Sequence, residues 1–177
     1  MKWKILKSEY PLISKWLTVR KDKVQIPSGY EMDDFYVLEY PHFVNVIAIT
    51  EDGLFLIEEQ YRHGLQRVSF ELCAGCIEKG EAPIDTAKRE LLEETGYSSD
   101  EWKLYMISAP NPNSMNNLCY TFLATNIKKT SNINREISED IRLHFFTKED
   151  IKNKLYNNLI IEGVMQAPLW KYIYENK

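Results

Sequence analysis

Residues 75–97 read GCIEKGEAPIDTAKRELLEETGY, and this acidic stretch organises our interpretation of the chain. Pro83 stands where the first residue of a helix belongs, and Gly96 stands where a left-handed C-terminal residue belongs. Ala82, at the predicted N-cap, has no side chain that could cap the helix. A mostly apolar stripe at helical spacing is expected to pack on the core. It consists of Ile84, Ala87, Leu91 and Thr95.

Acidic residues form the adjoining face of this predicted helix. Glu90, Glu93 and Glu94 fall together on it, and Glu81 lies in the loop just before. Glu90 and Glu94 repel each other at i,i+4 spacing, and the helix dipole disfavours negative charge in the last turn. A bound divalent cation would reverse this cost, because hard cations take carboxylate oxygens. The alternative is an ordinary solvated acidic face.

The spacing favours the cation. The stretch matches Gly-x5-Glu-x7-Arg-Glu-U-x-Glu-Glu-x-Gly-U, with U apolar or aromatic, at every fixed position. The matching residues are Gly75, Glu81, Arg89, Glu90, Leu91, Glu93, Glu94, Gly96 and Tyr97. This pattern resembles the Nudix box, the signature of the Nudix hydrolase family. That family hydrolyses nucleoside diphosphates linked to another moiety, using magnesium or manganese.

The resemblance implies a fold and a set of roles. The fold would be α/β (α+β): a mixed β-sheet sandwiched between helices, with an N-terminal antiparallel strand region. Glu90 and Glu94 would be the main metal ligands. Glu93 would assist them, and Arg89 would orient the carboxylates of the box.

Residues 60–75 contain QYRHG and FELCAG, which resemble the ADP-ribose and ADP-sugar pyrophosphatase branch of this family. The resemblance implies that Arg62 contacts the diphosphate and that Ala74 gives its backbone carbonyl to a metal. We predict that Glu71, in the same segment, binds substrate. Cys73 stands where the branch usually has a proline. The loss of this proline frees a backbone dihedral and restores a backbone N–H.

Two further predictions fall beyond the box. Residues 109–117 read APNPNSMNN, a loop by its composition. Pro112 stands where ADP-ribose pyrophosphatases carry a marker proline, although the rest of the loop is closer to an Asn-Pro form of related sugar-nucleotide hydrolases. The resemblance also implies a catalytic base before the last strand, with Glu139 the first candidate and Glu136 the second. An ordinary solvated loop is the alternative.

Apolar periodicity predicts the remaining elements. Strands are expected over residues 3–7, 16–24, 35–39, 43–50, 54–58, 102–109 and 120–124. A last, alternating strand is expected to end at residue 146. Residues 125–135 are expected to form a loop. A helix is expected after Thr147, and another over 160–174, where Pro168 would break or kink it.

The length of 177 residues predicts one domain over residues 1–177. The resemblance implies that this domain consists of a strand region at 1–40 and a Nudix core at 41–177. The net charge of −4 argues against nucleic acid or an anionic membrane as a partner. The first residues contain no uninterrupted apolar run, so we expect neither a secretory signal nor a membrane span.

Three cysteines, Cys73, Cys76 and Cys119, make an odd count that is typical of a reducing, cytoplasmic location. Cys73 and Cys76 form a CxxC without the second pair that a zinc site would need, so we interpret them as packing residues. The histidines, which show no metal-ligand spacing, are interpreted as structural. They are His42, His63 and His144.

We therefore expect a metal-dependent hydrolase that cleaves ADP-ribose or another ADP-sugar to AMP and a sugar phosphate. Its cofactor would be Mg²⁺ or Mn²⁺. The resemblance also implies a homodimer in which the N-terminal strands help to build the partner's site. Another sugar nucleotide, a dinucleoside polyphosphate or a nicotinamide dinucleotide could be the substrate instead. A Nudix-fold sensor of nucleotide sugars that does not turn them over is the alternative from another class, and a structural CxxC metal protein is a more distant one.

Overall fold

The computed structural model describes residues 1–135 and 140–176. The chain forms two compact units. The first contains residues 1–42 and 109–118, and the second contains residues 43–108 and 119–177.

The first unit is an antiparallel three-stranded sheet in the order β1 (Lys4–Ile13), β2 (Thr18–Gln25) and β3 (Glu31–Glu39). This confirms the predicted N-terminal strand region. The first and third predicted strands were shorter than the observed β1 and β3, whereas the second, at 16–24, began two residues before β2. The loop at 109–118 joins this unit through a hydrogen bond of 2.7 Å from the Leu38 amide to the Ser114 carbonyl.

The second unit is built on an eight-stranded sheet. Its strands are β4 (Phe43–Thr50), β5 (Phe55–Arg62), β6 (Arg67–Glu71), β7 (Cys73–Cys76), β8 (Tyr97–Ser98), β9 (Glu101–Ser108), β10 (Cys119–Lys129) and β11 (Ile141–Phe146). The main path runs β11-β5-β4-β10-β8, with β6 paired to β5, β7 to β4 and β9 to β10. β4 and β10 run parallel and the other pairs are antiparallel, so the sheet is mixed, as predicted.

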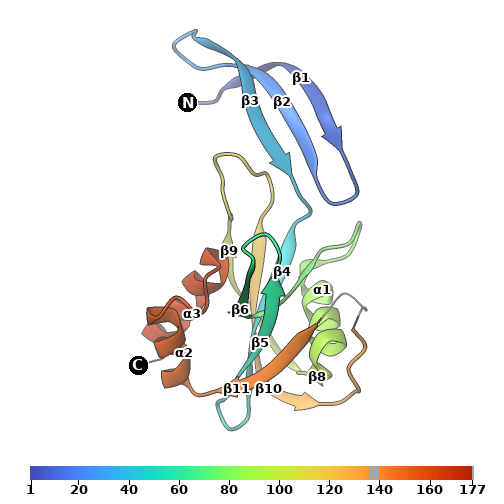
Figure 1. Cartoon of the computed structure of the whole chain (residues 1–177), viewed down its shortest axis with the longest axis vertical. Helices are drawn as coiled ribbons and strands as arrows, with labels where there is room; N and C mark the ends of the chain where they lie inside the picture. The colour runs from blue at the N-terminus through green and yellow to red at the C-terminus, as the bar shows by residue number, and fades with distance from the viewer. Residues whose placement is uncertain (136–139, 177) are drawn as a thin grey trace. The chain divides into compact units, whose positions relative to one another are not determined.

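Side chains of β4 alternate between the two faces of this sheet, as strand geometry requires. Ala87 of α1 (Pro83–Glu90) packs with Val44, Val46 and Ala48 on one face. Ile47 faces the other way and packs with α2 (Lys148–Tyr156) and α3 (Gly163–Glu175). Helices therefore cover both faces of the sheet (Figure 1), which confirms the predicted sandwich.

Pro168 lies inside α3, and the helix continues through it rather than ending there. A proline removes the hydrogen bond to the carbonyl four residues earlier, which here belongs to Val164. The buried side chain of Asn45 on β4 donates to that carbonyl at 3.1 Å. The freed backbone acceptor is thus satisfied from the sheet, and this contact ties α3 to β4.

The prediction of a loop over 125–135 is wrong for its first part, because β10 continues to Lys129. Asn126 has a positive φ of 53°, and the pairing of β10 with β4 shifts at this point. Ile127 is buried beyond the shift and anchors the extension. α2 begins with a capping box between Thr147 and Asp150, in agreement with the predicted start. Among the described residues, no helix combines the length and apolar character needed to cross a membrane.

Candidate active site

The acidic helix begins and ends where the sequence predicts, but its last turn is not α-helical. α1 begins at Pro83, and Gly96 ends the segment with a left-handed φ of 75°. Between them the chain changes into a π-helical segment, η1 (Leu91–Thr95). A π-turn spaces its hydrogen bonds at i→i+5. The turn therefore changes the direction in which Glu94 leaves the helix relative to Glu90.

The glutamates of the predicted acidic face lie at different depths. Glu94 is only 5% exposed, whereas the Glu93 side chain is 41% exposed. The Glu90 side chain lies between these extremes at 13%. The single acidic face that regular helical spacing predicts is therefore divided between the protein interior and the surface.

Gly75 of β7 leaves the space that the Glu90 carboxyl group occupies. A Cβ atom at Gly75 would lie 2.0 Å from the carboxyl carbon of Glu90, far inside van der Waals contact. The first glycine of the box is therefore required by close packing between strand and helix. The Glu90 carboxylate lies directly against β7, beside Ala74.

Arg89 connects three carboxylates. Its guanidinium donates two hydrogen bonds of 3.0 Å to Glu81. Nη1 also donates to Glu90 at 2.9 Å and to Glu93 at 3.2 Å. These hydrogen bonds lower the pKa of Glu81 to about 2 and raise the pKa of Arg89. The predicted orienting residue therefore touches three of the box acids, through the planar fork that arginine provides.

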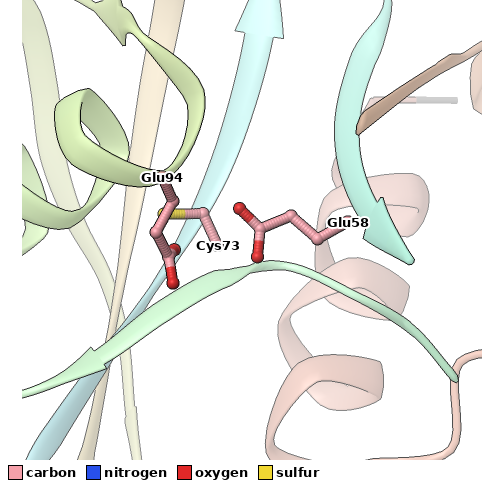
Figure 2. Close-up of side chains that lie close together, drawn as sticks. All are labelled: Glu58, Cys73 and Glu94. Atoms are coloured by element: carbon pink, nitrogen blue, oxygen red, sulfur yellow. The ribbon is translucent and has the colours of Figure 1, made fainter. Parts of the chain in front are cut away.

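Glu94 points instead toward Glu58 of β5 and Cys73 of β7 (Figure 2). One potential ligand atom from each of the three residues lies within 4.8 Å of the others. Glu58 and Cys73 are fully buried. Burial, together with the neighbouring Glu94 carboxyl group, raises the pKa of Glu58 and of the Cys73 thiol.

A cavity of about 630 Å³ opens beside the box loop, within the second unit. Its lining combines apolar side chains with Arg62 and two acids. The lining residues are Phe43, Arg62, His63, Gly64, Leu65, Glu71, Ala74, Gly75, Cys76, Ile161, Glu162 and Met165. This size and mixed character suit a small-molecule ligand with both a charged and an apolar part.

Arg62 and Glu71, both predicted to bind substrate, form an ion pair in this cavity. Nε and Nη2 of Arg62 donate to the Glu71 carboxylate, which is buried, and Gln60 adds a hydrogen bond of 3.2 Å. The Arg62 side chain remains 44% exposed. The pair fixes the arginine while leaving part of its guanidinium open to the cavity.

Two acids of this region escaped the sequence interpretation. Glu58 follows Leu56 by two residues in a strand, so both side chains leave the same, helix-covered face of the sheet. That spacing was a usable signal for a buried acid. Glu162 lies just before α3, where no motif marks it; burial and the nearby Glu71 raise its pKa.

The remaining predicted residues have separate outcomes. Pro112 belongs to the first unit, and Glu139 and Glu136 lie outside the described residues. Cys73 is buried, as the packing interpretation expects, whereas that interpretation is wrong for Cys76, which is exposed where β7 ends at the cavity.

Comparisons with known proteins give the family and the fold of the chain. The family model of the NUDIX domain matches residues 40–165. The chain belongs to the Nudix family. A second family model, the nucleoside diphosphate sugar hydrolase N-terminal domain, matches residues 3–38 of this Nudix protein.

Curated relatives cover most of the chain. The protein is 33% identical over 129 residues to a methanol dehydrogenase activator of Bacillus methanolicus, covering 73% of this chain and 69% of the relative. It is 33% identical over 139 residues to an ADP-ribose pyrophosphatase of Bacillus subtilis (strain 168), covering 77% of this chain and 73% of the relative. An ADP-ribose pyrophosphatase of Mycobacterium tuberculosis (strain ATCC 25618 / H37Rv) is 27% identical over 154 residues, covering 83% of this chain and 74% of the relative.

A solved structure supports the fold. The crystal structure of an ADP compounds hydrolase superposes with a TM-score of 0.84 at 18% sequence identity. The match covers 99% of this Nudix chain and 94% of the hydrolase chain. The predicted Nudix fold is thereby confirmed.

Proposed function

We propose that this Nudix protein hydrolyses the diphosphate of ADP-ribose or another ADP-sugar, giving AMP and a sugar phosphate. One observation carries the proposal. The carboxylate of Glu90 lies against Gly75, and Gly75 and Ala74 line the same cavity as Arg62. The proposed metal ligand Glu90 therefore lies next to the wall of the cavity that Arg62, the proposed diphosphate ligand, lines. The matched N-terminal family model and the two related ADP-ribose pyrophosphatases support the substrate class.

The arrangement fits a divalent cation. The carboxyl group of Glu90 lies against Gly75, and that of Glu94 lies near Cys73. These two residues flank Ala74 in β7. Oxygen ligands of Glu90, Glu94 and the Ala74 carbonyl would hold Mg²⁺ or Mn²⁺, which prefer such donors. When bound, the metal would neutralise the diphosphate and lower the pKa of the attacking water. Arg89 holds Glu90 and Glu93 in place through its hydrogen bonds.

Substrate contacts follow from the cavity. Arg62 would bind the diphosphate with the part of its guanidinium that the pair with Glu71 leaves exposed. Phe43 and Leu65 offer apolar surface for the nucleoside. We assign Pro112 to the substrate-binding loop. Glu139 is our proposed general base, with Glu136 second, because a carboxylate within reach of the attacking water can take its proton.

We also propose that the chain works as one domain, as a homodimer in the cytoplasm. Residues 1–40 would be used in dimerisation. In the first unit, Ile5, Leu12 and Ile13 of β1 are exposed apolar side chains, which supports a protein partner for this sheet. The three free cysteines support a reducing compartment.

The test is release of AMP from ADP-ribose, with other sugar nucleotides, dinucleoside polyphosphates and NADH alongside, in Mg²⁺ or Mn²⁺. Glu90→Gln and Glu94→Gln should each lower kcat/KM by about 100-fold or more, since each removes a metal ligand. Glu149→Gln, at an exposed position on α2, is the matched control and should leave kcat/KM unchanged. Turnover of another member of the panel would change the substrate. Tight binding without turnover of any of them would replace the hydrolase by a sensor.

A further inference from the structure

Glu58 is a buried acid for which the proposed hydrolysis has no role. Its residue is 0% exposed, and it lies on the α1-covered face of β5. Both carboxylate oxygens are buried without a hydrogen-bond partner among the described residues. Burying a carboxylate that accepts no hydrogen bond is strongly unfavourable. A ligand of opposite charge would remove this cost.

Two other potential ligands lie next to this carboxylate. Cys73 comes from β7, and Glu94 comes from the π-turn of the box helix. Figure 2 shows the three side chains close together, with the carboxyl group of Glu58 directed toward Glu94 and Cys73. One ligand atom from each lies within 4.8 Å of the others. Ligand atoms around a tetrahedral zinc ion lie about 3.3–3.6 Å apart, so atoms within 4.8 Å of one another are already near that separation.

Two carboxyl groups this close repel each other unless a proton or a cation lies between them. Arg135 supplies one positive charge nearby. It donates from Nε to the Glu94 carbonyl at 2.7 Å, and its charge acts on Glu58. Two carboxylates, a thiolate, a divalent cation and this arginine together have zero net charge. A divalent cation therefore suits the electrostatics of the cluster.

We propose that Glu58, Cys73 and Glu94 form a zinc site, distinct from the oxygen-lined site for Mg²⁺ or Mn²⁺ but sharing Glu94 with it. Zinc accepts thiolate and carboxylate ligands together, whereas magnesium takes oxygen ligands. On binding, the Cys73 thiol gives its proton to solvent and its sulfur coordinates the ion. The carboxylates of Glu58 and Glu94 complete three protein ligands.

Sharing Glu94 has a consequence that rests on the proposed function. An ion held by Cys73 and Glu58 withdraws Glu94 from the hydrolytic metal site. Zinc should then inhibit hydrolysis supported by Mg²⁺, and Cys73→Ser should relieve that inhibition. Binding of the ion itself is independent of whether the protein hydrolyses anything.

The deciding experiment uses Co²⁺ as a spectroscopic probe for zinc. Titrating the full-length wild-type protein with Co²⁺ should produce a sulfur-to-cobalt charge-transfer band in the near ultraviolet, saturating at one equivalent. Zn²⁺ should displace the Co²⁺ and abolish the band. Cys73→Ser should abolish the band, and Glu58→Gln should weaken Co²⁺ binding by about 10- to 100-fold or more. Cys76→Ser is the matched control, because this exposed thiol lies in the same strand, and it should retain the band.

Absence of the band in folded wild-type protein would overturn the proposal and leave a shared proton between the two acids. Retention of the band in Cys73→Ser with its loss in Cys76→Ser would also overturn it, by assigning the sulfur to the exposed cysteine. Because the wild-type titration alone can refute the site, the outcome does not depend on the stability of any variant. Activity without the band would sink the zinc site and leave the hydrolase proposal intact.

Discussion

Replacing Gly75 by alanine tests the contact on which the proposed metal site depends. The added Cβ would lie 2.0 Å from the Glu90 carboxyl carbon, whereas ordinary van der Waals contact begins at 3.4 Å. The carboxyl group or the strand must therefore move by about 1.4 Å. Either movement separates Glu90 from β7 and from Arg89, its hydrogen-bond donor.

A displacement of this size should reduce activity strongly. Misplacing a group by about 1 Å can cost about 100-fold in rate, which corresponds to about 2.7 kcal/mol of transition-state stabilisation. We expect kcat/KM for ADP-ribose in Mg²⁺ to fall by about 100-fold in Gly75→Ala. The assay is chromatographic measurement of AMP, with thermal unfolding recorded on the same preparations.

The matched control is Gly163→Ala at the exposed first position of α3. A Cβ there meets nothing within 4 Å, so both kcat/KM and the melting temperature should stay close to wild type. Wild-type activity in a folded Gly75→Ala variant would refute the reasoning. It would show that the position of Glu90 against β7 is not needed for turnover.

Three further predictions concern stability and the substrate cavity. Glu81→Gln should lower the free energy of unfolding above pH 5, because the folded-state pKa of Glu81 is depressed from 4.5 to about 2. The difference from wild type should vanish as the pH falls toward 2. Urea unfolding across this pH range measures the difference, and a constant difference would contradict the prediction. Leu91→Ala should lower the free energy of unfolding, measured in urea, by about 2–5 kcal/mol, since this side chain is fully buried. Leu92→Ala, at a partly exposed position, should lower it much less. Equal losses would count against the described packing of the helix. Arg62→Ala should raise KM for ADP-ribose and lower the melting temperature, because it removes a phosphate ligand and leaves the buried Glu71 carboxylate without its cation. An unchanged KM would remove Arg62 from the substrate site.

Much of the fold follows from local patterns in the sequence. The eight residues of β4 were predicted with the observed bounds, because a buried strand is a continuous apolar run between turn residues. Pro83 and Gly96 mark the ends of the helical box segment through backbone preferences that do not depend on the rest of the protein. The fixed spacing of the box acids similarly places Glu81, Glu90 and Glu93 within reach of one arginine.

Other features depend on segments that meet only in the folded chain. Pro168 is accommodated within α3 because Asn45, more than one hundred residues earlier, donates to the carbonyl that the proline leaves free. The π-turn that directs Glu94 inward is not encoded by helical periodicity, which assumes one constant turn. Pattern reasoning therefore assigned a break or kink to Pro168 and one acidic face to the box.

The sequence by itself determined the family, the mixed sheet between helices and the acids of the box, since each of these is expressed in short-range spacing. Only the tertiary structure brought Glu58 of β5 and Cys73 of β7 to Glu94 of the box helix. Their proximity is set by strand pairing and by a helix packed across the sheet. Contacts of that kind depend on chain segments far apart in sequence, so no local pattern records them.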